Sequence, residues 1–276
     1  MKLILLGEQA TGKSSFLVAL YGALVNRAVG GLRIVRTIDD VEFLSRGLVA
    51  FGRQESLRRT EIDSDAQLLV EIAEGDRAVT LQIPDRSGEL LRHMLDARVW
   101  DPDILEQSRV AAGAMLFLRA DRLAAEPEPI SPGNGVDPQA GAPDDFGREQ
   151  AERPWSPALM PPDARSVDLL QSLMDRRSEP LPLAIIVSAW DRVSEYGSPR
   201  DWLADRLALL DQFLTANADR LPSAVFGVSA QGGDFSAGLP EQLAGEDPWD
   251  RAYLIAPDGQ GSTMASPIAW LMDATT

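Results

Sequence analysis

A glycine-bounded loop between an apolar strand and a helix constrains this chain more than any other feature of its sequence. The segment GEQATGKSS fits the pattern G-x-x-x-x-G-K-[S/T] through Gly7, Gly12, Lys13 and Ser14. An apolar run at 2–6 precedes it and a helical pattern over 13–25 follows, which is the context that the pattern requires. In such a loop backbone N–H groups surround a phosphate, the lysine bridges phosphate oxygens, and the serine hydroxyl reaches Mg²⁺. The segment, with Ser15 beside it, therefore predicts a nucleotide phosphate site.

Short apolar runs and helical patterns alternate along most of the chain. Runs typical of strands covered on both faces lie at Ala114–Leu118, Leu183–Val187 and Ala224–Val228. Apolar residues at three- and four-residue spacing predict helices over Glu89–Trp100, Val167–Arg176, Trp202–Leu214 and Ser266–Met272. Two further runs, Gln67–Ala73 and Ala78–Ile83, flank a glycine turn and predict one antiparallel hairpin. The expected fold is a three-layer α/β domain with a mostly parallel sheet.

A proline-rich segment interrupts this alternation from Arg122 to Arg165. It holds nine of the 19 prolines, so we expect a disordered insertion without a core of its own. A second stretch, Gly232 to Gly261, is glycine-rich and acidic and predicts a loop elaboration. The expected organisation is one domain over residues 1–276 that carries these two additions.

Charge and composition narrow the classes of partner. Asp plus Glu number 42 against 26 Lys plus Arg, a net charge of −16 that disfavours nucleic acid and anionic lipid surfaces. The chain has no Cys and a single His, His93, which excludes disulfides, thiolate nucleophiles and zinc sites built from these residues. The longest early apolar stretch, Leu3–Leu6, is too short for a signal peptide or a membrane span. We expect a cytoplasmic protein that inserts into no membrane.

Three further motifs follow expected strands. In the DRSG segment, Asp85 can reach Mg²⁺ through water and the N–H of Gly88 can approach a γ-phosphate. Asp191 ends the run VSAWD at the carboxyl edge of the sheet, where α/β folds bind ligands and where a carboxylate can accept two hydrogen bonds from a guanine base. Ser229 and Ala230, in VSAQ after the next strand, would bring backbone N–H groups to the same base.

In this order, GEQATGKS, DRSG, SAWD and SAQ resemble the G1, G3, G4 and G5 elements of the Ras-like, translation-factor-related (TRAFAC) GTPases. More narrowly, TGKSSFLVALY, DRSGE, VSAWD and FGVSAQGGD resemble the bacterial double-GTPase (DO-GTPase) families, which are associated with multi-gene conflict systems. The resemblance covers most of the chain outside the insertion. It implies a P-loop domain that binds GTP or GDP with Mg²⁺, hydrolyses GTP slowly as a conformational switch, and meets protein partners through its switch loops and insertion.

The resemblance also implies roles for single residues. A threonine before the hairpin should contact Mg²⁺ and the γ-phosphate, and Thr60 in the polar stretch RQESLRRTEIDSD fits better than Thr37, which ends an apolar run. Lys13 would hold the β- and γ-phosphates during hydrolysis. Glu89 takes the position of the residue that orients the attacking water, where its negative charge would slow intrinsic hydrolysis.

The base-binding element departs from the usual pattern. Ser188 and Ala189 stand where these GTPases have Asn and Lys, so the expected preference for guanine is modest. Trp190 is an alternative stacking surface, but a tryptophan beside a central strand is expected in the core.

Alternatives stay open at other points. Arg58 and Arg59 are either an arginine finger supplied in cis or surface arginines that offset nearby acids. His93, one helical turn after Glu89, is expected to be solvated or packed and not catalytic. Two other functions also stay open, a nucleotide-bound assembly module with negligible hydrolysis and a P-loop ATPase or kinase.

Overall fold

A computed structural model gives the fold. It describes residues 1–26, 31–37, 41–55, 68–83, 87–122, 160–193, 195–233 and 245–275, together with the single residues Val29, Leu57 and Leu243. Most of the proline-rich segment, residues 123–159, lies outside the described residues.

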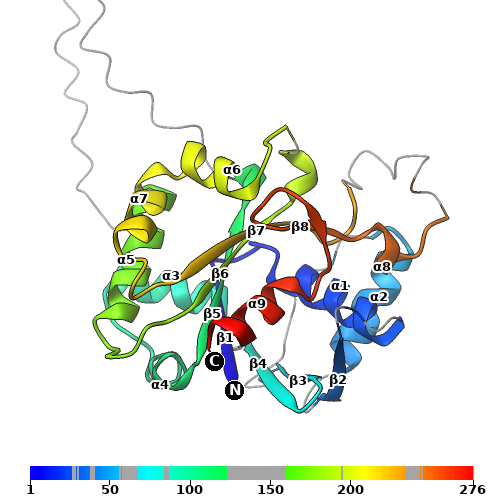
Figure 1. The fold of residues 1–276 in the computed structure, drawn as a ribbon, viewed down its shortest axis with the longest axis horizontal. Coiled ribbons are helices and arrows are strands. Elements are labelled where there is room, and N and C mark those ends of the chain that lie inside the picture. Colours follow the sequence, from blue (N-terminus) through cyan, green and yellow to red (C-terminus); the bar gives the residue numbers. More distant parts are fainter. Residues whose placement is uncertain are drawn as a thin grey trace, which may run out of the picture.

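The described strands form one sheet with the order β2-β3-β4-β1-β5-β6-β7-β8-β9 (Figure 1). They are β1 (Lys2–Leu6), β2 (Leu32–Thr37), β3 (Leu68–Glu74), β4 (Arg77–Ile83), β5 (Gly113–Arg119), β6 (Leu183–Ser188), β7 (Ser223–Ser229), β8 (Tyr253–Ile255) and β9 (Gly261–Ser262). β1 lies between β4 and β5 and pairs in parallel with both, and β6 and β7 continue the parallel part. Antiparallel pairs stand at the two ends, β2-β3-β4 and β7-β8-β9. The predicted hairpin is confirmed as β3 and β4.

Helices cover both faces of this sheet (Figure 1). They are α1 (Lys13–Asn26), α2 (Val41–Gly52), α3 (Ser87–Ala97), α4 (Pro102–Val110), α5 (Pro162–Met174), α6 (Pro199–Arg206), α7 (Ala208–Ala216), α8 (Pro248–Arg251) and α9 (Ser266–Ala274), with short 3-10 turns η1 (Ala120–Arg122) and η3 (Trp190–Arg192).

Alternation along the strands divides the core into two clusters. Leu3 and Leu5 of β1 pack with apolar residues of α1, α2 and α9, whereas Ile4 and Leu6 pack with those of α3 to α7. The same division continues along β5 and β6, because successive side chains of a strand point to opposite faces. The predicted three-layer α/β fold is confirmed. No helix in the described part of the chain combines the length and the apolar character needed to cross a bilayer.

The helix after the insertion begins earlier than predicted. α5 starts at Pro162, whereas the apolar spacing predicted a start at Val167. Residues 162–165, which the sequence placed in the insertion, are therefore helical. Proline is favoured at the first helical position because its missing N–H has no partner there in any case. Apolar spacing alone misses such a start, since Asp163 and Ala164 carry no bulky apolar side chain.

Two other helices also differ from expectation. The predicted helix over 202–214 is divided into α6 and α7 at Leu207, whose φ of −136° and ψ of 56° leave the helical region. α4 was not predicted, although Asp101 accepts hydrogen bonds from the N–H groups of Asp103 and Ile104 as a helix cap and Pro102 takes the first position.

The second predicted loop, 232–261, contains regular structure in its later half. There α8 is followed by β8 and β9, which extend the sheet beside β7 in antiparallel order. These strands have three and two residues, too short for an alternating pattern to reveal them in the sequence.

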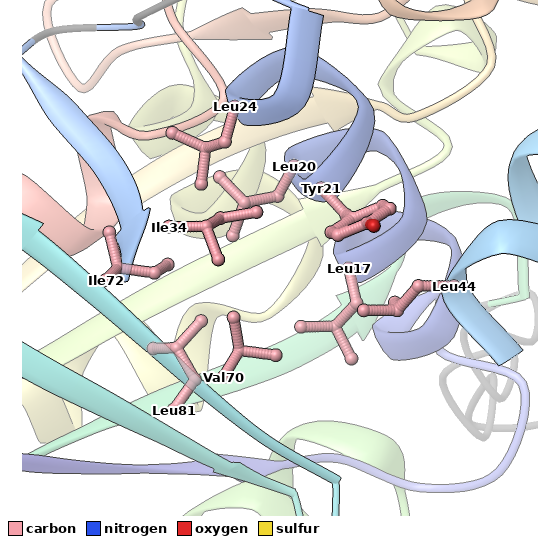
Figure 2. Close-up of a pocket in the computed structure, with 9 residues that line it drawn as sticks. All are labelled: Leu17, Leu20, Tyr21, Leu24, Ile34, Leu44, Val70, Ile72 and Leu81. Carbon is pink, nitrogen blue, oxygen red and sulfur yellow. The ribbon is translucent and has the colours of Figure 1, made fainter. Parts of the chain in front are cut away.

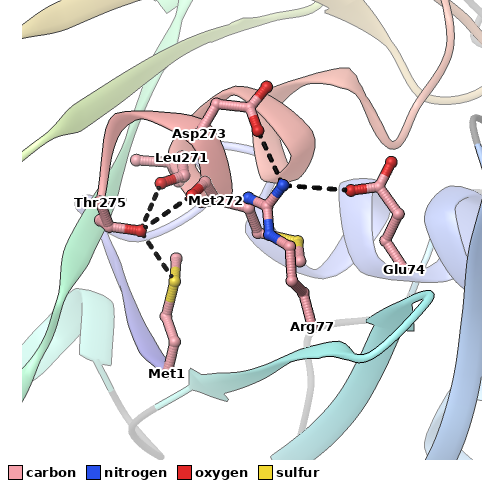
Figure 3. A network of polar contacts seen from close by, with 7 residues as sticks. All are labelled: Met1, Glu74, Arg77, Leu271, Met272, Asp273 and Thr275. Carbon is pink, nitrogen blue, oxygen red and sulfur yellow. Dashed lines mark hydrogen bonds and ion pairs between the residues drawn. The ribbon is translucent and has the colours of Figure 1, made fainter.

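A polar network joins the amino end of β1 to the β3–β4 turn and to α9 (Figure 3). Arg77 forms ion pairs with Asp273 at 2.9 Å and Glu74 at 3.6 Å, and Thr275 Oγ1 donates to Met1 Sδ at 3.1 Å. This network lies at the end of β1 opposite to the glycine-bounded loop.

The space between α1 and the β2–β3–β4 end of the sheet is filled by apolar packing. Figure 2 shows the side chains that meet there: Leu17, Leu20, Tyr21, Leu24, Ile34, Leu44, Val70, Ile72 and Leu81. They leave a gap of about 10 Å³, at the lower limit for one water molecule. The gap is a packing defect of the core, not a ligand site.

Candidate nucleotide-binding site

The glycine-bounded loop connects β1 to α1 as the sequence predicted. Gly7 and Gly12 have φ angles of +148° and +91°, which favour glycine. A Cβ atom on Gly7 would lie 2.9 Å from the carbonyl oxygen of Phe117, and one on Gly12 would lie 2.7 Å from Cβ of Ser188. Both glycines are therefore required by close approach of the neighbouring strands β5 and β6 as well as by backbone conformation.

Lys13 folds back over the loop. Its Nζ donates to the carbonyl oxygens of Gly7 at 2.6 Å and Glu8 at 2.8 Å, and lies 3.5 Å from Thr11 Oγ1. Burial lowers the pKa of Lys13 from 10.5 to about 8, an effect that the charge of Glu8 partly opposes. A buried ammonium group whose pKa is lowered by desolvation is stabilised in its charged form when an anion binds beside it.

Ser14 and Ser15 stand in the first turn of α1 and are partly exposed. Helical hydrogen bonding begins with Phe16, whose N–H donates to Gly12 O at 2.9 Å. The N–H groups at the start of a helix have no partner within it, and the helix dipole places partial positive charge there. Lys13, Ser14 and Ser15 thus surround a helix N-terminus that favours phosphate.

The loop is tied to the carboxyl end of β6. Ser188 Oγ donates to the carbonyl oxygen of Thr11 at 2.8 Å. This residue stands in place of the Asn expected from the resemblance, and its shorter side chain still reaches the loop because Gly12 has no Cβ in the way. The bond holds the glycine-bounded loop against β6, the strand that leads to Asp191.

Asp191 and Ser229 meet at the ends of β6 and β7. Ser229 is buried, and its Oγ donates to Asp191 Oδ1 at 2.6 Å. Tyr253 of β8 approaches the same pair: burial raises the pKa of its hydroxyl, Asp191 raises it further, and a hydrogen bond with Ser229 opposes both. Ala230 follows directly at the end of β7. The sequence therefore correctly placed these three predicted base-site residues on one edge.

Trp190 is a core residue, as expected. Only 3% of it is exposed, and a Cβ atom on Gly227 would lie 2.4 Å from its indole ring. Ala189 before it adopts φ 56°, a left-handed turn that directs the chain from β6 into η3. Trp190 is thereby excluded as a surface for a nucleotide base.

An arginine outside the predicted motifs contacts the loop from the carboxyl end of β5. Arg119 ends β5 in register with Ser188, and its Nη1 donates to the carbonyl oxygen of Ala10 at 3.4 Å. Its Nε and Nη2 donate to both carboxylate oxygens of Asp121, at 2.5 and 3.0 Å. Arg192 Nε lies 3.5 Å from the same carboxylate.

Arg165, which belongs to α5, joins the glycine-bounded loop to α3. Its Nε donates to Glu8 Oε1 at 2.9 Å and its Nη1 lies 3.4 Å from Asp96 Oδ1 of α3. Arg165 is 8% exposed, which is unusual for an arginine and indicates a structural role. The sequence analysis had assigned this residue to the insertion.

The remaining predicted residues are less fully described. Gly88 and Glu89 lie in the first turn of α3, whereas Thr60 and Asp85 lie outside the described residues, as do Arg58 and Arg59. Thr37, the alternative to Thr60, pairs with Val70 inside the sheet. His93 is exposed on α3, in agreement with expectation.

A magnesium ion at this site would be bound by oxygen atoms of the protein, of the nucleotide phosphates and of water. In the described part of the chain no three His, Cys, Asp or Glu residues gather in a way that could hold a metal. Mg²⁺ usually keeps several waters and binds through one or two protein oxygens together with substrate phosphates. The hydroxyl of Ser14 beside the helix N-terminus fits that mode, so the residues present agree with Mg²⁺ carried by a nucleotide.

The position of Arg119 at the edge of the sheet could have been predicted from the sequence. A charged residue directly after a buried strand of a parallel sheet lies at the carboxyl edge, which is the argument that selected Asp191. Glu8 and Arg165 had no comparable signal, because their contact depends on the packing of distant segments.

Comparisons with known proteins complete the description. The family model described as "DO-GTPase1: Double-GTPase 1" matches residues 4–271. No curated protein matches the chain.

Solved structures that match the chain include three of low identity. Roco2 RocCORdC of Methanosarcina barkeri bound to GDP is 11% identical (TM-score 0.36), and the match covers 84% of this chain and 44% of that one. The small GTPase Arl6 (BBS3) of Trypanosoma brucei with bound GppNp is 8% identical (TM-score 0.40; 100% and 96%). The cytosolic domain of the T. maritima FeoB iron transporter in a GDP form is 10% identical (TM-score 0.36; 100% and 63%). The chain thus spans less than half the length of the Roco protein.

Proposed function

This chain belongs to the Double-GTPase 1 family, and on that premise we propose that it binds GTP and GDP with Mg²⁺, hydrolyses GTP to GDP and phosphate, and acts as a conformational switch in a multi-protein system. Family membership supports guanine-nucleotide binding. Hydrolysis, the metal and the switch are the parts that need experiment.

One arrangement carries the proposal. The loop that holds Lys13 and the pair Asp191–Ser229 occupy the carboxyl ends of parallel strands in one sheet, joined by the bond from Ser188 to Thr11. A nucleotide has a polyanionic end and a base with hydrogen-bond donors at its edge. The arrangement offers a cationic cradle for the first and a carboxylate for the second.

In this proposal the phosphates lie along the loop and the start of α1. Lys13 contacts the β- and γ-phosphates, and the backbone N–H groups from Gly7 to Ser15 surround the β-phosphate. Mg²⁺ would be held by Ser14, with Thr60 and Asp85 as further ligands, and when bound it supplies positive charge to the phosphate oxygens.

Hydrolysis then depends on the start of α3. The N–H of Gly88 would contact the γ-phosphate, and Glu89 would orient a water molecule toward it. A carboxylate beside the γ-phosphate repels the negative charge of the transition state, so we expect slow turnover without an activating partner. The same feature favours the second candidate, an assembly module that keeps its nucleotide.

The base would lie over the ends of β6 and β7. Asp191 accepts hydrogen bonds from the two donors on the guanine edge, and backbone groups of Ser229 and Ala230 approach the same base. Adenine lacks this donor pair, so ATP should compete less well than GTP. Protein partners would contact the switch loops and the insertion.

Three measurements test the proposal. Mass spectrometry identifies the nucleotide retained on purification, and titration with GTP, GDP and ATP gives the affinities. Lys13→Ala should abolish binding, whereas Lys2→Ala, at the exposed opposite end of β1, should leave it unchanged. Equal affinity for ATP and GTP would favour the ATPase alternative.

Time-resolved phosphate release separates a GTPase from an assembly module, since the module would release none. Hydrogen exchange then tests the switch. The segments 52–65 and 85–92 should be more protected with a non-hydrolysable GTP analogue than with GDP, because only the former can bond to Thr60 and Gly88. Equal protection would mean that the nucleotide is a fixed structural ligand.

A further inference from the structure

A purine base bound at the Asp191 edge needs more than partners for its hydrogen bonds. Its two faces are flat and apolar, and burying a face against a planar group contributes much of the affinity for nucleic-acid bases. A planar side chain that stacks on the base at this edge must be both rigid and accessible.

Two aromatic residues near this edge do not meet these two conditions. Trp190 is 3% exposed and packed on Gly227. Tyr253 belongs to β8, and its hydroxyl is already hydrogen-bonded to Ser229.

Arg119 meets both conditions. Its guanidinium forms a forked pair with the two oxygens of Asp121 and reaches Ala10 O in the phosphate loop, so three of its nitrogens are directed by fixed partners. Hydrogen bonds hold the guanidinium plane at its edges and leave stacking to its faces. The side chain is 30% exposed, so part of the group is accessible.

The position of Arg119 fits a nucleotide whose phosphates are held by the loop and whose base is held by Asp191. It stands in register with Ser188, three residues before Asp191, and its contact with Ala10 places it beside the loop that would hold the phosphates. The hydrogen bond from Arg119 holds the pKa of Asp121 below its ordinary value, against the opposing effect of burial, which keeps the fork ionised.

We propose that Arg119, held by Asp121 and by the carbonyl of Ala10, is the residue that stacks on the face of the nucleotide base. This inference rests on the proposed nucleotide-binding function and extends it, because Arg119 belongs to none of the sequence motifs. Stacking is indifferent to the exocyclic groups of the base, so Arg119 contributes affinity for purines and leaves the choice between them to Asp191.

The test compares three ligands with the full chain. GDP and inosine diphosphate both present a purine face, whereas inorganic tripolyphosphate has no base. Arg119→Ala should weaken GDP and inosine diphosphate by the same factor, about tenfold, and leave the competition by tripolyphosphate unchanged. Asp121→Asn, which loosens the fork but keeps the guanidinium, should give a smaller loss for the same two ligands.

Arg98→Ala is the matched control. Arg98 also forms a short ion pair, with Asp168 of α5 at 2.6 Å, but it stands directly after the carboxyl end of α3 and should change no affinity. Unfolding of the ligand-free variants by urea shows whether Arg119→Ala alters stability by itself.

The outcomes separate the two levels of the argument. Equal weakening of tripolyphosphate would mean that Arg119 acts by supporting the phosphate loop, and unchanged GDP affinity would mean that it does not touch the base; either result overturns the inference. If the unaltered protein binds neither nucleotide, the proposed function fails instead, whatever Arg119 does.

Discussion

Arg165 of α5 donates a hydrogen bond to the carboxylate of Glu8, the second residue of the phosphate loop, across 157 positions of sequence. The same guanidinium approaches Asp96 of α3. One side chain thus connects the loop to α3, which begins within the DRSG segment, and to α5, which follows residues 123–159. A shift of either helix would therefore displace Glu8 and the loop.

Replacing Arg165 by Ala should lower the free energy of unfolding by about 1–2 kcal/mol, since charge-assisted hydrogen bonds are lost but both carboxylates are partly solvated. Arg98→Ala, which removes a more exposed ion pair, should cost less than about 1 kcal/mol. Urea titration of both variants gives the comparison. Equal losses would mean that burial of Arg165 adds nothing.

Two deletions of the insertion should behave differently. Removing 123–159 and rejoining the ends with a Gly/Ser linker should leave stability and nucleotide affinity nearly unchanged, because long surface loops cost little closure entropy. Extending the deletion to Arg165 removes the first turn of α5 and the contact with Glu8, and should lower the melting temperature clearly. A large loss with the shorter deletion would show that the segment packs on the domain.

Nucleotide affinity should depend on pH through Lys13. Its pKa is about 8 in the free protein, and bound phosphate favours the charged ammonium, so binding takes up a proton when the pH exceeds that value. Affinity should be flat from pH 6.5 to 7.5 and fall by up to about tenfold per unit above pH 8. Calorimetry in two buffers of different ionisation enthalpy measures the proton uptake.

Lys13→Arg is the control, because guanidinium stays charged throughout and any affinity that remains should no longer depend on pH in this range.

The stability of the free protein should change with pH in the opposite direction to the affinity. The pKa of Lys13 is lower in the folded than in the unfolded chain, so between about pH 8 and 10.5 the unfolded chain binds more protons and this residue's contribution to stability increases with pH.

Ser229→Ala should weaken guanine nucleotides by about fivefold, because Asp191 loses the hydrogen bond that orients its carboxylate. ATP, which gains little from that carboxylate, should be affected less. Asp191→Ala should remove the preference for GTP altogether. Tyr253→Phe is the matched control: it removes the other bond to Ser229 and leaves the Asp191 contact in place, so the preference should persist.

Much of the fold could be predicted from local patterns. β1, β5, β6 and β7 are continuous apolar runs because helices cover them on both faces, and the turn at Gly75 identified the β3–β4 hairpin. The loop between β1 and α1 could be predicted because its glycines, lysine and serine are close together in the sequence. Asp191, Ser229 and Ala230 followed from the rule that parallel strands present their carboxyl ends on one edge.

Contacts between distant segments were not predictable in this way. Arg119 and Ala10 are 109 positions apart, and no local periodicity records their approach. The early start of α5 was missed because a proline pair resembles a linker when apolar spacing is the only guide. The assignments of Thr60 and Asp85 stay predictions, and those of Gly88 and Glu89 extend no further than their place in α3.

The position of β1 in the sheet has a consequence for synthesis of the chain. Lys2 pairs with Thr80 and Leu3 with Gly113, so β1 receives its second neighbour only after β5 has been synthesised. Until then the apolar faces of β1 and α1 have few of their native partners. Non-local pairing of this kind slows folding and exposes nascent apolar surface. The nascent chain should therefore engage chaperones early, through the segment from β1 to α1.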